Sequence, residues 1–130
     1  MTTPFWCLLV VAVLPYLLAN MGGYFKFKQF GNLDNNHPRL QAARLEGIGA
    51  RALAAQMNAW EALGVFSAAV FMAHLTHADP EASATAAKIY VATRIAHPVF
   101  YLADIAPARS AAFLVGLGCL GRLFYLAATA

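Results

Sequence analysis

The sequence predicts an all-α fold, a bundle of four transmembrane helices that forms a single domain over residues 1–130. Two observations predict it. Of the 130 residues, 61% are hydrophobic and only 12% are charged, whereas a soluble domain carries about 25% charged residues. The apolar residues also gather in four runs, each long enough to cross roughly 30 Å of hydrocarbon. A chain this short cannot bury so many apolar side chains, so we expect its surface to face lipid.

The first span is predicted over residues 4–24, because no charged residue occurs between Pro4 and Tyr24. A cleaved signal peptide is the alternative, but it needs a positive N-terminal region and a shorter apolar core. No Lys or Arg precedes Lys26, which favours a membrane span. Pro15 lacks a backbone donor and is expected to kink this helix.

The second span is predicted over residues 52–75, within a helix that begins earlier, near Pro38. Asn36-His37-Pro38 offers a capping residue followed by an early proline, which is typical of a helix start. The sequence therefore predicts one long helix that enters the membrane from a polar connection.

The third span is predicted over residues 84–105 and the fourth over residues 110–128. Asp79-Pro80-Glu81 before the third span reads as an N-cap, a proline in the first turn and a first-turn acid. We expect Pro107 to end this helix. The fourth span contains small residues that let membrane helices approach closely, namely Gly116, Gly118 and Gly121.

Loop charge predicts the orientation. The second connection carries two acids and no Lys or Arg, and the third carries Arg109. The positive-inside rule then places the first and third connections in the cytoplasm and both termini on the other side, as in a bacterial inner-membrane protein. Arg122 runs against this rule and is expected to snorkel or to pair with an acid. The cations of the first connection and the helix start after it are Lys26, Lys28, Arg39, Arg44 and Arg51.

Polar side chains recur on one face of each of two apolar helices. A charge facing hydrocarbon costs about 2.5–3.5 kcal/mol, so such residues usually face a bundle interior or a wet cavity. Helical spacing puts each set on one face. The second helix carries Arg44, Arg51, Asn58 and Glu61, and the third carries Tyr90, Arg94, His97, Tyr101 and Asp104.

We interpret the two faces, with Arg109 just beyond them, as a polar pocket that opens to the cytoplasm. Arg donors would pair with ligand carboxylates, and Glu61 with a ligand amine. His97 could donate a proton near neutral pH, and Pro98 is expected to disturb the helix there. The alternative is structural, an interhelical ion pair of Glu61 with Arg94.

For two further sets of residues, a redox or metal-binding role has to be compared with a purely structural role. Cys7 and Cys119 are isolated thiols in apolar runs, and we expect them to pack as hydrophobic residues because buried thiols react poorly. His74, His77 and Asp79 form an H-x-x-H-x-D run that lacks a clear fourth metal ligand. We interpret it as a solvated loop end and predict no metal. No basic tract indicates a nucleic-acid partner.

Over nearly its whole length the chain resembles the bacterial-type members of the family called membrane-associated proteins in eicosanoid and glutathione metabolism (MAPEG). The first shared motif is Asn35-Asn36-His37-Pro38-Arg39 followed by residues 51–61, in which Asn58-x-x-Glu61 lies inside an apolar helix. The second is Arg94-x-x-His97-x-x-x-Tyr101, followed by Arg109. The resemblance implies a MAPEG-like four-helix bundle assembled as a homotrimer in membrane lipid.

The resemblance further implies a glutathione-dependent transferase or peroxidase that acts on a lipophilic substrate, with glutathione bound between subunits on the cytoplasmic side. Asn58 and Glu61 would hold the glutathione backbone and its amino end, and Arg109 would stabilise the thiolate. An Arg next to a thiol favours its anion, which is the nucleophile. The further glutathione contacts implied are Arg51, Arg94, His97 and Tyr101.

Two alternatives stay open. The first is a non-catalytic trimer that binds lipids or partners. Glutathione-using members often carry an Arg four residues before the Asn, and Ala54 in that position favours this alternative. A Tyr is also often found in those members where this chain has His97. The second is a small four-span drug exporter, which needs an acid in its first span for proton coupling. No Asp or Glu occurs before Gly31, which argues against an exporter.

Overall fold

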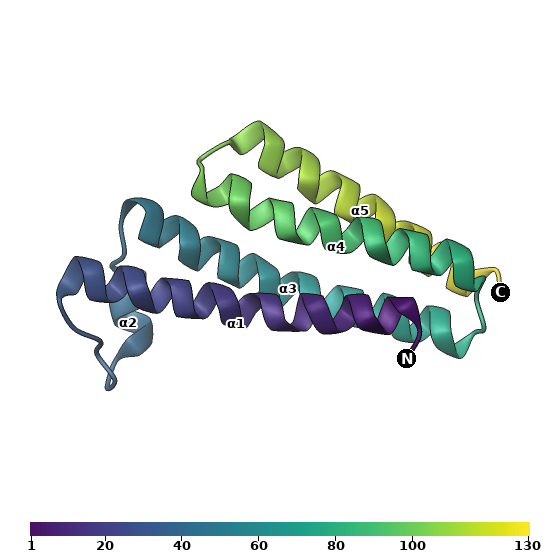
Figure 1. The fold of residues 1–130 in the computed structure, drawn as a ribbon, viewed down its shortest axis with the longest axis horizontal. Coiled ribbons are helices and arrows are strands. Elements are labelled where there is room, and N and C mark those ends of the chain that lie inside the picture. Colours follow the sequence, from purple (N-terminus) through teal and green to yellow (C-terminus); the bar gives the residue numbers. More distant parts are fainter.

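Four long helices and one short helix make up the chain, and no strand is present. The computed structural model describes residues 1–130. The long helices lie side by side as a bundle, and the short helix α2 lies in the first connection (Figure 1). The prediction of an all-α fold is confirmed. The helices are α1 (Thr3–Phe30), α2 (Pro38–Ala43), α3 (Gly47–Leu75), α4 (Pro80–Leu102) and α5 (Ala106–Ala128).

Only α1 and α5 are both long and apolar enough to cross a membrane by length and composition. Ionisable residues interrupt the other two long helices, Glu61 in α3 and Arg94 in α4. The prediction of four spans is therefore supported for the first and fourth helices and stays a prediction for the second and third. Large apolar side chains on the outside of the bundle, such as Leu17 and Leu114, are more than half exposed, as a surface that faces lipid requires.

The first connection differs from the prediction. The long helix expected from Pro38 is instead the short helix α2, a break at Arg44–Glu46, and then α3. Arg44 therefore does not share a helix face with Asn58, and its place in the predicted stripe was wrong. The α1 helix also runs six residues past the predicted span, to Phe30, and ends at Gly31, whose left-handed φ of 75° suits glycine.

Side chains rather than a long helix hold this connection together. The Gln41 amide, buried at 8% exposure, donates to the Asn32 carbonyl at 3.0 Å and accepts from the Asp34 backbone N–H at 3.1 Å. The Asp34 carboxylate accepts the backbone N–H groups of His37 and Asn36, each at 2.9 Å, which lowers the pKa of Asp34. The N-cap of α2 is His37, which forms no side-chain cap hydrogen bond, so the expected cap at Asn36 is wrong and Asp34 orders the turn before the helix.

The third and fourth helices start and stop differently from the predicted spans. The Asp79 carboxylate accepts the Ala82 N–H at 2.6 Å, so the predicted N-cap of α4 is confirmed. This helix ends at Leu102, not at Ile105, because Asp104 turns the chain with a φ of 59°. Pro107 therefore lies in the first turn of α5 and does not end α4.

The prolines inside the long helices do not break them. The α1 helix continues through the buried Pro15, and α4 continues through the buried Pro98. The disturbance expected at the level of the pocket is therefore not a helix break.

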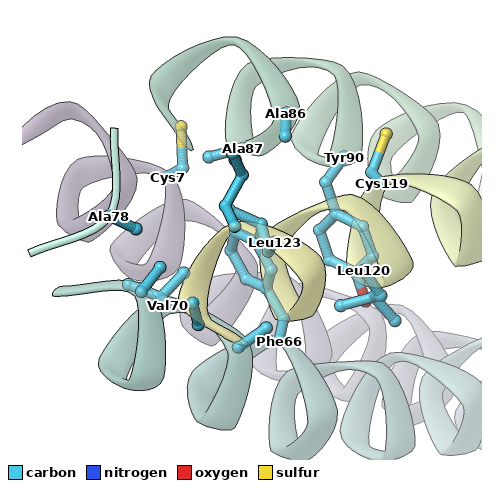
Figure 2. Packing of buried hydrophobic residues seen from close by; sticks show 14 of the residues in the cluster. Cys7, Phe66, Val70, Ala78, Ala86, Ala87, Tyr90, Cys119, Leu120 and Leu123 are labelled. Carbon is cyan, nitrogen blue, oxygen red and sulfur yellow. The ribbon is translucent and has the colours of Figure 1, made fainter. Parts of the chain in front are cut away.

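The core lies where α1, α3, α4 and α5 meet in the half of the bundle near the termini (Figure 2). The rings of Phe66 and Tyr90 stack there with their centroids 4.2 Å apart, and Leu123 is fully buried. Cys7 and Cys119 are free thiols within this same cluster, so the prediction that they pack as hydrophobic residues is confirmed.

The connections divide between the two ends of the bundle. Both termini lie at the same end as the α3–α4 connection, and the other two connections lie at the opposite end (Figure 1). The end with two connections is called the connection end below, and the other the terminal end. The connection end carries the basic residues from which the cytoplasmic side was predicted.

Candidate functional site

Arg94 of α4 lies at the centre of the polar residues and forms hydrogen bonds to two neighbouring helices, α3 and α5. It is only 5% exposed. Its Nη1 donates to the Asn58 Oδ1 of α3 at 3.3 Å, and its Nη2 donates to the Ala112 carbonyl of α5 at 3.4 Å. Both hydrogen bonds are long for a charged donor, and the buried Nε has no partner. The guanidinium is therefore held in place but keeps donor capacity for a further acceptor.

Gly116 provides the space that the guanidinium occupies. A Cβ at this position would lie 3.0 Å from Arg94 Nη2 and 3.0 Å from Thr93 Oγ1. Aromatic rings flank the same group: its Cζ lies 5.4 Å from the centre of the Tyr90 ring and 5.9 Å from that of Phe113. Such rings stabilise a cation through their faces. The α5 helix thus shapes the site without supplying a charged side chain.

Asn58, Glu61 and Arg94 line one groove of about 240 Å³ between α3, α4 and α5. Glu61 is exposed and forms no ion pair, because the single ion pair of the structure joins Arg51 to Asp104. The structural alternative, in which Glu61 pairs with Arg94, is therefore not formed. The two opposite charges share a groove without neutralising each other, which leaves both available to a ligand with a carboxylate and an amine.

A second set of predicted residues lies nearer the connection end. The Arg109 guanidinium lies 4.3 Å from the centre of the Tyr101 ring, and the Tyr101 ring meets His97 edge to face at 5.6 Å. Arg51 donates to the Leu102 carbonyl at 3.3 Å and forms its ion pair with Asp104 at 3.7 Å. None of these residues lines the groove that contains Arg94.

The helix pairing fixes how far apart the two sets lie. Arg94 contacts Asn58 on α3, and Leu102 accepts from Arg51, so α3 and α4 run antiparallel in a constant register. Tyr101 is seven residues from Arg94, or about 10 Å along the helix. The predicted site is therefore two layers. The inner layer is Asn58, Glu61 and Arg94, and the outer layer is Arg51, Tyr101 and Arg109.

His97 lies between the layers and faces inward. It is 5% exposed and borders, with Arg94 and Asn58, a small hollow of about 10 Å³ against α1. A hollow of that size holds no ligand. The Tyr90 hydroxyl is used within the protein as well, because it donates to the Ala62 carbonyl at 3.1 Å. Asp104, expected on the α4 stripe, lies beyond the helix end and is 71% exposed.

The remaining metal-type residues are placed apart from this site. His74 packs edge to face on Phe5 with centroids 5.0 Å apart. His77 turns the chain after α3 with a φ of 58°, and Asp79 caps α4. All three serve the α3–α4 connection at the terminal end.

Sequence reasoning missed the contributions of α5 to the groove. Gly116 was assigned to general helix packing, and neither Phe113 nor the Ala112 carbonyl was singled out. The spacing of Gly116, Gly118 and Gly121 was a usable signal, but it does not tell which glycine faces a guanidinium. Only the pairing of α4 with α5 shows that.

Comparison with known proteins decides the family. The model of the MAPEG family matches residues 3–129 of the 130-residue chain. The chain belongs to the MAPEG family. No curated protein and no solved structure matches it. The resemblance drawn from the two sequence motifs is thereby confirmed, and membership of MAPEG agrees with a membrane protein of glutathione-related function.

Proposed function

We propose that this MAPEG protein is a membrane-bound glutathione-dependent transferase or peroxidase that acts on lipophilic electrophiles. The observation that carries the proposal is the groove in which Asn58, Glu61 and Arg94 converge. Charged residues inside apolar helices are costly and mark functional sites by default. Here the cation and the acid share one groove without pairing, as a zwitterionic ligand requires.

The donors of the groove fit glutathione, which has an ammonium group and carboxylates. Arg94 keeps a buried Nε without a partner and two long hydrogen bonds that a carboxylate would replace with shorter ones. Glu61 is free to accept the ligand ammonium. The Asn58 amide supplies a neutral contact beside them.

The dimensions of the site support a tripeptide. Three extended residues span about 10 Å, which equals the axial separation of the inner and outer layers. A ligand that contacts Arg94 at one end would thus extend to the level of Tyr101 and Arg109, whereas Glu61 lies about one helical turn farther toward the terminal end. The groove of one chain measures about 240 Å³, below the roughly 300–1,000 Å³ of ligand sites. We therefore propose that a neighbouring subunit of a homotrimer closes the site.

Glutathione supplies the thiol, and the protein supplies its position and charge environment. Arg109 is the proposed stabiliser of the thiolate: it forms no ion pair, and only the Tyr101 ring holds its guanidinium. An adjacent cation lowers the pKa of a thiol below its usual value near 8.5. The membrane would deliver the lipophilic partner to the same face by partitioning.

Isothermal titration of the detergent-solubilised protein with glutathione tests the binding step. We expect Glu61→Gln to raise the dissociation constant about tenfold or more, because a charge-assisted hydrogen bond contributes about 1.5–3 kcal/mol. Glu81→Gln is the matched control, since it removes an acid at the terminal end, and it should bind like wild type. Equal dissociation constants for Glu61→Gln and wild type would show that Glu61 does not contact glutathione.

Conjugation of a dinitrohalobenzene and reduction of a lipid hydroperoxide test the catalytic step. We expect at least one of the two to depend on glutathione in the purified protein. Glutathione binding with neither activity would contradict an enzyme and favour the non-catalytic trimer that Ala54 suggested.

A further inference from the structure

A second groove, of about 670 Å³, runs between α4 and α5 at the terminal end, away from the proposed glutathione site. Its outer rim carries Asp79 and Glu81 at the start of α4, and Arg122 of α5 lies on its wall. Its floor is apolar and open, since Ile89 is 46% exposed and Val115 is 50% exposed. The groove therefore has charged residues near the terminal end and an apolar surface beyond them.

Arg122 has no acidic partner in the chain. Its guanidinium lies 5.5 Å from the centre of the Tyr125 ring, but neither carboxylate of the rim lies within ion-pair distance. The sequence offered two outcomes for this residue, snorkelling or pairing with an acid, and pairing is not observed. An unpaired Arg on an apolar helix costs about 2.5–3.5 kcal/mol, so an external anion would stabilise it.

The charges of the groove lie at different depths. Gly116 faces Thr93 and Arg94, which fixes the antiparallel register of α4 and α5. Arg122, six residues beyond Gly116, is then level with Ala87. Glu81 lies six residues nearer the terminal end, or about 9 Å farther out. Arg122 thus lies farther from the terminal end of the bundle, and therefore deeper in the predicted membrane, than the two carboxylates.

We propose that this groove binds a phospholipid whose headgroup combines a phosphate with a primary ammonium, as in phosphatidylethanolamine. In such a lipid the phosphate lies deeper than the ammonium, which is the order of Arg122 and the two acids. Arg122 pairs with the phosphate. The carboxylates are acceptors only and take the ammonium N–H donors, while an acyl chain lies along Ile89 and Val115. The site goes beyond the proposed function and does not depend on it.

The chemistry also predicts which lipids are rejected. Phosphatidylcholine has a quaternary ammonium without an N–H donor, so it cannot hydrogen-bond to Glu81. Phosphatidylglycerol carries a net negative charge and meets two carboxylates without an ammonium to neutralise them. The groove therefore selects the primary amine, whereas a simple cationic patch would favour the anionic lipid.

Native mass spectrometry of the full chain in neutral detergent tests the site, with the three lipids added in turn at matched acyl chains. We expect phosphatidylethanolamine to be retained about tenfold more tightly than either competitor. Arg122→Gln should abolish that preference and Arg122→Lys should keep it. Lys88→Gln is the matched control, because it removes an exposed cation of α4 that does not line the groove, and it should behave as wild type.

Three results would overturn the proposal. Equal retention of the three lipids, or tighter retention of phosphatidylglycerol, would show that the carboxylates take no part. Unchanged retention of phosphatidylethanolamine in Arg122→Gln, with helical content equal to wild type by circular dichroism, would show that Arg122 does not bind the phosphate. A change of oligomeric mass in Arg122→Gln without a change in lipid retention would make the groove a contact between copies of the chain.

Discussion

Arg94 shows how a single charged side chain is accommodated in an apolar bundle. Burying a guanidinium without partners would be prohibitive, and the structure meets this with an amide from α3, a backbone carbonyl from α5 and two flanking rings. One donor, Nε, stays without a partner. At the residue scale the site is therefore a cation that the protein satisfies only in part.

Gly116→Ala tests whether the position of this cation matters. The added Cβ would meet Arg94 Nη2 and Thr93 Oγ1 at 3.0 Å, so the guanidinium must move, at a cost of about 1–3 kcal/mol in stability. We expect glutathione affinity measured by titration calorimetry to fall about tenfold. Gly121→Ala is the matched control, because a Cβ there meets nothing within 4 Å. Equal affinities in the two variants would contradict the role of Arg94.

Arg109→Ala tests the proposed thiolate stabiliser. Without the cation, the pKa of the bound thiol should rise toward its free value near 8.5, so the ultraviolet band of bound thiolate at pH 7 should fall about tenfold or more. Arg109→Lys should retain part of it because the charge persists. Native mass spectrometry should give the same oligomeric mass for all three proteins. Unchanged glutathione turnover in Arg109→Ala would refute the assigned role.

At the scale of elements, the first connection is where sequence reasoning failed. Proline at the start of α2 correctly indicated a helix start, but the helix does not continue into α3. The Gln29 side chain accepts the Glu46 N–H at 3.0 Å and donates to the Arg44 carbonyl at 3.1 Å, and this fixes the break. Contacts between residues fifteen or more positions apart decide it, and helical periodicity does not contain them.

Gln41→Ala tests how this connection is held. Removing the amide leaves the Asn32 carbonyl and the Asp34 N–H without their partner, which costs about 1–3 kcal/mol. We expect faster hydrogen exchange in residues 31–43 and unchanged protection in α5. Gln56→Ala, which removes an amide of α3 that forms no side-chain hydrogen bond, is the matched control. Equal exchange in both variants would show that the connection is held by other contacts.

The acid at Asp34 adds a pH dependence to the same element. Its pKa is lowered in the folded protein by the His37 and Asn36 backbone N–H groups, so its stabilising effect is present above its unfolded pKa, near 3.8. That effect is lost as the pH falls through the lower folded value. We expect the side-chain carboxyl carbon resonance of Asp34 to shift only below about pH 4. A midpoint of that resonance above the unfolded value near 3.8 would contradict the assignment.

For the whole molecule, periodicity and composition sufficed for the coarse architecture. The apolar runs predicted the four long helices, and the spacing of Asn58 with Glu61 and of Arg94 with His97 predicted shared faces. The faces did not reveal that the residues form two layers, because that follows from the register between helices. The small residues of α5 were likewise visible in the sequence, but their contact with Arg94 was not.

The orientation in the membrane is also a property of the whole molecule. The basic connection end is predicted to face the cytoplasm, so Asn35→Cys should resist a membrane-impermeant maleimide in intact cells and react after lysis. Thr129→Cys at the terminal end should react in intact cells. The wild type is the control, since Cys7 and Cys119 are only 8% and 9% exposed. The reverse labelling pattern would show that the connection end faces away from the cytoplasm, which contradicts the predicted orientation.

The central claim is that the inner layer of α3 and α4 receives glutathione. A cryo-electron microscopy map of the full-length protein in lipid nanodiscs with saturating glutathione tests it most directly. We predict density for the tripeptide in contact with Asn58, Glu61 and Arg94, in a site closed by a second copy of the chain. A map at side-chain resolution that shows lipid in this groove, or glutathione bound elsewhere, would contradict it.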